Sequence, residues 1–102
     1  MERFLVRLTD KGLEPDIAQK WVVLPDGLTW TFRLNTGVRF PNGQVVDASV
    51  IADLVKKNAD LFKISASAEA LDDFTVVIKF ATDVNPDEIP KFLIMLSLSV
   101  LP

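Results

Sequence analysis

The segment LTWTFRL, residues 28–34, decides the fold class of this chain. Every second residue in it is large and apolar, namely Leu28, Trp30, Phe32 and Leu34. Threonine and arginine occupy the alternate positions. This alternation, with aromatic and β-branched residues, predicts a β-strand with one apolar and one polar face. The aromatic side chains are therefore expected to pack in a core.

A tight turn precedes this strand. Pro25-Asp26-Gly27 joins a proline, which presets φ, to a glycine that supplies a positive φ. Residues 21–24, WVVL, predict a short strand before the turn. The two strands and the turn together predict an antiparallel hairpin.

The N-terminal segment is expected to be extended and then briefly helical. Residues 3–9, RFLVRLT, alternate and predict a strand, and Asp10-Lys11-Gly12 predicts a turn. Proline suits the first position of a helix, so a short helical turn is expected at Pro15–Lys20.

One long helix is expected after the hairpin. Asn42-Gly43 predicts a turn, and Asp47 is a good N-cap. Apolar residues then recur at helical spacing, which predicts a helix over Ala48–Leu61. Val50 stands three residues after the cap, so no capping box is expected.

The C-terminal part is expected to add two strands and a helix. Residues 65–71 and 74–80 predict strands separated by a turn at Asp72-Asp73, and residues 89–98 predict a helix kinked near Pro90. Hairpins dominate and no βαβ repeat occurs. The order indicates an α+β fold, with an antiparallel sheet of about four to five strands and helices on one face. The length of 102 residues predicts a single domain, 1–102.

The composition argues against several kinds of site. The chain has no cysteine and no histidine, which removes thiolate metal sites, the commonest metal ligand and the commonest general base. Its basic residues are scattered and its net charge is -3, which argues against nucleic acid. The acidic pairs Asp72-Asp73 and Asp87-Glu88 are typical of a turn and a helix start. No catalysis, metal or cofactor is expected.

The hydrophobic fraction of 49% is high for a small soluble domain. It predicts either a very apolar core or an apolar face that a partner covers, and we expect the second. The apolar run Phe92–Leu101 is too short to cross a bilayer. We expect this run, or an exposed strand edge, to form a homodimer contact. Met1 is not followed by a basic and then an apolar region, so no signal peptide is expected in this chain.

Several short motifs occur in a fixed order between Leu5 and Val50. They are Leu5-Val6-Arg7, Gly12, Pro15, Ile17-Ala18, Trp21, DGLTWTFRL at 26–34, GVRF at 37–40, Asn42-Gly43 and Asp47-Ala48. In this order and spacing they resemble family 5 of the bacterial extracellular solute-binding proteins, the peptide- and nickel-binding subunits of ABC importers. The segments 74–80 and 90–102 fit the continuation of that family more loosely.

The resemblance implies a fragment of a larger two-lobed receptor of periplasmic-binding-protein type II. This stretch is similar to a small accessory subdomain near the start of the first lobe. Its implied partners are the remainder of the receptor, the ABC permease subunits, and a peptide, nickel chelate or similar solute. The implied location is periplasmic or extracellular, at the membrane. Ligand contacts are expected to come mostly from other segments. The motif residues are expected to direct folding, and they are Gly27, Trp30, Phe32, Gly43 and Asp47.

Two departures from the family pattern concern the helix. Family members usually carry an acidic pair where this chain has Ser49 and Val50. They also usually insert a long loop after the helix, which contributes ligand contacts in some members, whereas Phe62-Lys63-Ile64 connects directly here. Two alternatives stay open: a solute-sensing module of a bacterial transcriptional regulator, and a free-standing small interaction domain.

Overall fold

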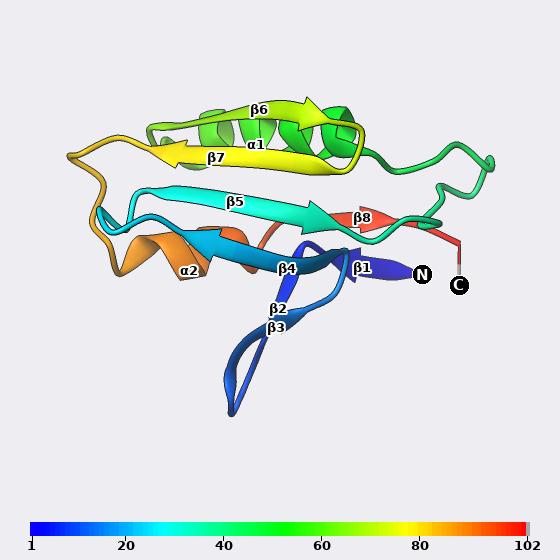
Figure 1. Ribbon diagram of the computed structural model, residues 1–102, viewed down its shortest axis with the longest axis horizontal. Coiled ribbons are helices and arrows are strands. Elements are labelled where there is room, and N and C mark those ends of the chain that lie inside the picture. The colour runs from blue at the N-terminus through cyan, green and yellow to red at the C-terminus, as the bar shows by residue number, and fades with distance from the viewer. Residues whose placement is uncertain (102) are drawn as a thin grey trace.

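The computed structural model describes residues 1–101, which form an α+β fold (Figure 1). The strands are β1 (Glu2–Phe4), β2 (Val6–Thr9), β3 (Gly12–Pro15), β4 (Ala18–Val23), β5 (Thr29–Leu34), β6 (Ala66–Asp72), β7 (Thr75–Phe80) and β8 (Ser97–Ser99). The helices are α1 (Ala48–Phe62) and α2 (Glu88–Leu93). No helix within residues 1–101 is long and apolar enough to cross a membrane.

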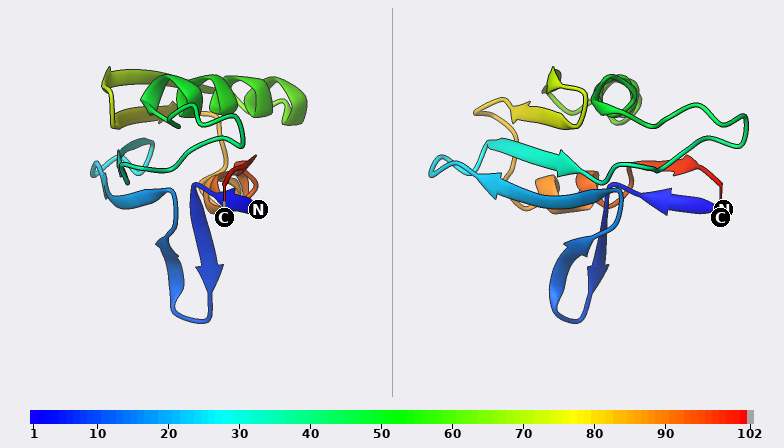
Figure 2. Two further views of the ribbon diagram at one scale, coloured as in Figure 1. Left: turned by 90° about the vertical axis from the view of Figure 1, so that its right-hand side faces the viewer. Right: turned by 45° about the vertical axis from the view of Figure 1, so that its right-hand side comes forward.

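A four-stranded antiparallel sheet, in the order β4-β5-β7-β6, is the centre of the fold. Both helices lie on the same side of this sheet (Figure 2), with α1 against β6 and β7. The expected fold class, an antiparallel sheet with helices on one face, is confirmed. The expected hairpin is also confirmed, because β4 and β5 pair around the turn at Pro25–Leu28.

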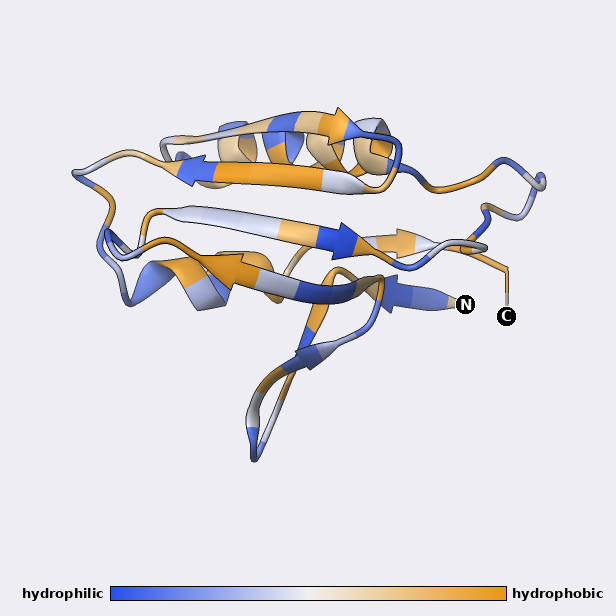
Figure 3. Ribbon diagram, in the orientation of Figure 1, coloured by the Kyte–Doolittle hydropathy of each residue, from blue (hydrophilic) through white to orange (hydrophobic). Residues whose placement is uncertain are grey.

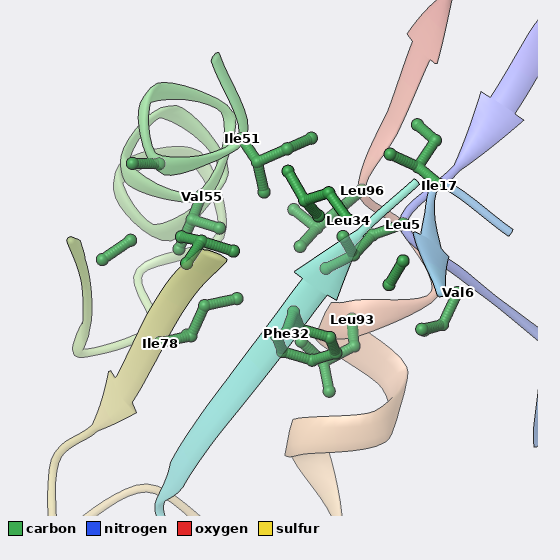
Figure 4. Close-up of a cluster of buried hydrophobic side chains, with 14 of the residues drawn as sticks. Leu5, Val6, Ile17, Phe32, Leu34, Ile51, Val55, Ile78, Leu93 and Leu96 are labelled. Atoms are coloured by element: carbon green, nitrogen blue, oxygen red, sulfur yellow. The ribbon is translucent and has the colours of Figure 1, made fainter. Parts of the chain in front are cut away.

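The core lies between the sheet and the helices (Figure 4). Phe32 and Leu34 of β5 and Ile78 of β7 are buried on the sheet side, and Ile51 of α1 and Leu93 of α2 face them. Each fully buried side chain of this size contributes about 1.5–3 kcal/mol relative to an exposed one. The face predicted from the alternation in residues 28–34 is therefore the buried face.

Two small antiparallel ribbons accompany the main sheet. Strand β1 pairs with β8, and the Met1 ammonium nitrogen lies 2.9 Å from the Val100 carbonyl oxygen, so the two ends of the described chain lie side by side. Strand β2 pairs with β3 in a hairpin that projects from the body of the molecule (Figures 1 and 2). Leu8 on this hairpin is 61% exposed.

The predicted single strand at residues 3–9 is wrong, because the chain bends at Leu5 and forms two strands with different partners. The predicted helical turn at Pro15–Lys20 is also wrong, because these residues are extended except for a break at 16–17. Tertiary hydrogen bonds take the place of helical ones. The Ile17 N–H donates to the Phe4 carbonyl (3.0 Å), and the Ala18 N–H donates to the Leu5 carbonyl (2.9 Å).

The predicted helix at residues 89–98 is correct only in its first half. Helix α2 ends at Leu93, and Ser97–Ser99 pairs with β1 instead of continuing the helix. Leu93 and Leu96 are fully buried within their own chain and Leu98 is half-buried. Most of this apolar run is therefore unavailable for the homodimer contact expected of it, since the chain itself covers the run.

Helix α1 begins and ends close to the predicted positions. The Asp47 carboxylate accepts a hydrogen bond from the Val50 N–H at 3.1 Å, which satisfies one of the free donors of the first turn. At the other end Lys63 adopts a left-handed conformation with φ of 55°. This conformation stops the helix and turns the chain directly into β6.

Candidate functional site

Three of the five motif residues form one unit at the β4–β5 turn. Gly27 has φ of 70°, the left-handed region that favours glycine. The Trp30 indole Nε1–H donates to the Gly27 carbonyl at 3.2 Å. Trp30 also stacks on Phe32, with ring centroids 6.1 Å apart and planes inclined by 12°. The turn and the aromatic pair therefore support one another.

The other two motif residues lie on the segment that leads into α1. Gly43 has φ of 89°, and its N–H donates to the Phe40 carbonyl at 2.8 Å. Asp47 caps α1 as described above. None of the five residues lines the hollow at Phe4–Leu8 and Ile94 or the three others found beside Ser65, Asn85 and Leu54. All five residues thus make local contacts that shape turns, the core and a helix end.

The most connected polar group of the described chain is the carboxylate of Asp16, whose side chain is only 6% exposed. It accepts hydrogen bonds from Arg3 Nε (2.8 Å), Arg7 Nε (2.9 Å) and the Phe4 N–H (3.0 Å). The Asp16 carbonyl accepts further bonds from Arg3 Nη2 (3.1 Å) and Asn35 Nδ2 (2.8 Å). One residue thereby joins β1, β2 and the end of β5 at the base of the projecting hairpin.

Two opposing effects act on the pKa of Asp16. Burial raises it, but the Phe4 N–H and the guanidinium groups of Arg3 and Arg7 outweigh that effect and hold the pKa below its ordinary value of 3.8. The carboxylate is therefore charged at neutral pH, and its charge is matched by two arginines. A carboxylate engaged in this way stabilises the structure and is a poor candidate for proton transfer.

Sequence reasoning missed the role of Asp16. The only local signal was an aspartate between Pro15 and the apolar Ile17-Ala18 pair. Its arginine partners lie 13 and 9 residues earlier in the chain. Nothing in the spacing of those residues reveals that a bend at Leu5 brings them together.

A hollow of about 250 Å³ lies at the base of the projecting hairpin. It is lined by Phe4, Val6, Arg7, Leu8 and Ile94. The Arg7 guanidinium carbon is 6.0 Å from the centre of the Phe4 ring, and its Nε is already bonded to Asp16. The lining is otherwise apolar, so the hollow does not bring together the several polar groups that typically orient a small ligand.

Groupings that could support metal binding are absent from the described part of the chain. Among residues 1–101, no three acidic side chains are grouped closely enough to hold a metal ion, and histidine and cysteine do not occur in the sequence. No buried side-chain nitrogen or oxygen there lacks a hydrogen-bond partner. Each buried polar side-chain atom of these residues thus has at least one hydrogen-bond partner within the fold.

Comparison with solved structures shows the class of protein in which this fold occurs. Chains of this fold are found within the substrate-binding subunits of ABC transporters. Over 91% of its length the chain superimposes on such a protein from Sinorhizobium meliloti, with a TM-score of 0.76, 26% identity and 21% of that protein covered. It also superimposes on NikA from Brucella suis in complex with Fe(III)-EDTA, with a TM-score of 0.67, 28% identity, and 78% and 18% of the two chains covered.

The sequence comparisons agree with the structural ones. The model of the bacterial extracellular solute-binding proteins, family 5 Middle, matches residues 12–101. The glutathione-binding protein GsiB of Pectobacterium atrosepticum is 33% identical over 75 residues, which cover 65% of this chain and 15% of that protein. The nickel-binding periplasmic protein of Escherichia coli is 41% identical over 44 residues, 43% and 8% of the two chains.

This chain belongs to family 5 of the bacterial extracellular solute-binding proteins. The resemblance of its motifs to that family is thereby confirmed. The matched regions span less than a fifth of the length of the curated relatives.

Proposed function

We propose that this chain is a structural subdomain in the first lobe of a substrate-binding protein of an ABC importer, and that it carries no catalysis. The observation that carries the proposal is the family match over residues 12–101, together with the small share of each relative that the chain covers. The solute is a peptide, a nickel chelate or a similar small molecule. The remainder of the binding protein and the permease subunits are its partners, in the periplasm or outside the cell at the membrane.

The interior of the chain supports a structural role. Asp16 is the only polar or charged residue among the buried residues of the described chain, and its partners are two arginines, an asparagine and a backbone amide. The motif residues make contacts within turns, the aromatic pair and the helix cap. The carboxylate of Asp16 is thereby engaged by groups of its own chain.

The proposal is tested by calorimetric titration of the isolated chain. With no convergent polar pocket, we expect it to bind neither a library of di- and oligopeptides nor nickel chelates more tightly than about millimolar. The nickel-binding periplasmic protein of Escherichia coli, titrated with the same chelates, serves as the positive control. A stoichiometric micromolar signal from the isolated chain would show that it carries a ligand site of its own.

A further inference from the structure

Two turns of the chain repeat one pattern, an apolar residue followed by proline, then aspartate or asparagine, then glycine. The first turn is Leu24-Pro25-Asp26-Gly27 and the second is Phe40-Pro41-Asn42-Gly43. In each turn the glycine N–H donates to the carbonyl of the apolar residue, at 2.9 Å in the first and 2.8 Å in the second. The second turn carries a side-chain amide where the first carries a carboxylate, and the amide has a chemistry of its own.

Asn42 is exposed on the connection between β5 and α1. In Figure 3 this connection reaches out to one side of the molecule, and hydrophilic residues lie at its tip. The Asn42 Oδ1 accepts a hydrogen bond from the Gln44 N–H at 2.9 Å. Gly43 has φ of 89°, and a Cβ there would meet no atom outside the adjacent residues within 4 Å. The space around the peptide nitrogen that follows Asn42 is therefore open.

Of the four asparagines of the chain, Asn42 is the one that glycine follows. The Nδ2 groups of Asn35 and Asn58 each donate to a main-chain carbonyl at 2.8 Å. Asn58 also lies inside α1, where the helix holds the following peptide nitrogen in a hydrogen bond. Asn85 precedes Pro86, which has no N–H to lose. Attack of the next peptide nitrogen on the side-chain amide is thus hindered at the other three positions.

We propose that Asn42 is a site of spontaneous deamidation. The main-chain nitrogen of Gly43 gives its proton to water or hydroxide and attacks the Cγ of Asn42, and the amide nitrogen leaves as ammonia. The product is a five-membered succinimide. Water then opens this ring at the Cγ carbonyl to give aspartate, or at the main-chain carbonyl to give isoaspartate. The reaction consumes one water, releases one ammonia and needs no cofactor or partner.

Two contacts of the turn act on this reaction in opposite directions. The Gln44 N–H donates to the oxygen at which negative charge develops during the attack, and so favours it. The Phe40 carbonyl accepts the Gly43 N–H, and this hydrogen bond must open before the nitrogen can attack. Because water solvates the same oxygen in an unfolded chain, the second contact decides the comparison. The net strength of one such hydrogen bond makes the reaction of the folded chain about two- to tenfold slower than that of the unfolded chain.

The isoaspartate product changes the connection that carries it, because it adds a methylene group to the main chain inside the turn. The Phe40 N–H donates across this turn to the Gln44 carbonyl at 2.8 Å. The neighbouring Arg39 carbonyl accepts the Leu101 N–H, also at 2.8 Å. A longer main chain displaces these partners, so we expect faster amide exchange at Phe40 and Leu101 in the modified chain.

Peptide mapping by mass spectrometry, over time and at mildly alkaline pH, tests the proposal on the folded chain. We expect the exchange of amide for acid to occur first in the peptide that contains Asn42, with aspartate and isoaspartate products separated by chromatography. In urea the same reaction should run about two- to tenfold faster. The proposal is overturned if Asn42 stays unmodified, or if Asn35 or Asn58 reacts before it in the folded chain. A faster reaction in the folded chain than in urea would refute the control by the Phe40 carbonyl.

Two variants test the attacking atom and the turn. Gly43→Ala adds a methyl group beside the nitrogen and should slow the reaction about tenfold or more, which is about 1.4 kcal/mol or more in the barrier. Since alanine is strained at positive φ, this rate is also measured in urea, where the turn is absent, and an unchanged rate there would rule out attack by the Gly43 nitrogen. Asp26→Asn places an amide in the matching turn, so position 26 should then react within a few-fold of the rate at Asn42. Reaction at position 26 with none at Asn42 would refute the proposal.

Discussion

Replacing Asp16 with asparagine tests whether one buried carboxylate fixes the projecting hairpin to the body of the protein. The substitution keeps the shape of the side chain and removes its charge. Hydrogen bonds to charged groups contribute about 1.5–3 kcal/mol each, and breaking a fully buried ion pair costs about 3–5 kcal/mol. Here the side chains of Arg3 and Arg7 are 25% and 53% exposed and regain water. We therefore expect Asp16→Asn to lower the free energy of unfolding by about 2–3 kcal/mol.

Urea denaturation, followed by tryptophan fluorescence and by circular dichroism, measures this loss. Asp53→Asn is the matched control, because Asp53 lies on the exposed side of α1 and forms no ion pair among the described residues. Its effect should stay within about 0.5 kcal/mol. In Asp16→Asn the amides of β2 and β3 should also exchange faster than those of β5 and β7, since the hairpin loses its attachment to β1.

A loss below about 0.5 kcal/mol for Asp16→Asn, equal to that of Asp53→Asn, would refute the reasoning. It would mean that the arginines gain as much from water as from the carboxylate. A large loss with uniform exchange across all strands would show that Asp16 stabilises the whole molecule and does not specifically attach the hairpin.

Four further outcomes are expected. The folded-state pKa of Asp16 lies below its ordinary value of 3.8, so the charged carboxylate contributes fully to the free energy of unfolding above pH 3.8. This contribution is lost as the pH falls from 3.8 through the folded-state pKa, and Asp16→Asn should therefore flatten an acid-denaturation profile below pH 3.8. Asp47→Ala should cost about 1 kcal/mol in urea denaturation through loss of the helix cap. Gly27→Val should cost about 1–3 kcal/mol from backbone strain alone, since a Cβ there meets no atom within 4 Å; an equal loss in Gly27→Asn, which tolerates positive φ, would contradict this cause. Phe32→Ala should cost about 3–5 kcal/mol and the half-buried Trp30→Ala less, and the reverse order would show that the indole–turn contact outweighs core burial.

The parts of the fold that follow local rules could be predicted from the sequence. The alternation in residues 28–34 identified the buried face of β5, and the Asp47 cap with helical spacing placed α1. In these segments the intrinsic preference of the residues and the tertiary packing favour the same conformation.

The segments that were mispredicted depend on contacts distant in sequence. Pro15–Lys20 has a plausible helix start, but the backbone of Phe4 and Leu5 supplies hydrogen bonds that hold it extended. Residues 97–99 continue an apolar helical pattern, yet β1, almost the whole chain length away, offers a strand edge. The Asp16 cluster depends on the same long-range arrangement, so neither its partners nor its burial could be read from spacing.

The pairing of β1 with β8 has a mechanical consequence. In this register Glu2 lies opposite Ser99 and Phe4 opposite Ser97, so both ends of the described chain leave the ribbon at the same end. Opposing forces applied to the two ends would break the hydrogen bonds between β1 and β8 one after another, beginning with those nearest the ends, and not all together. The ribbon should therefore separate at low force, and the interior strands β5 and β7 should stay paired until β1 and β8 have come apart.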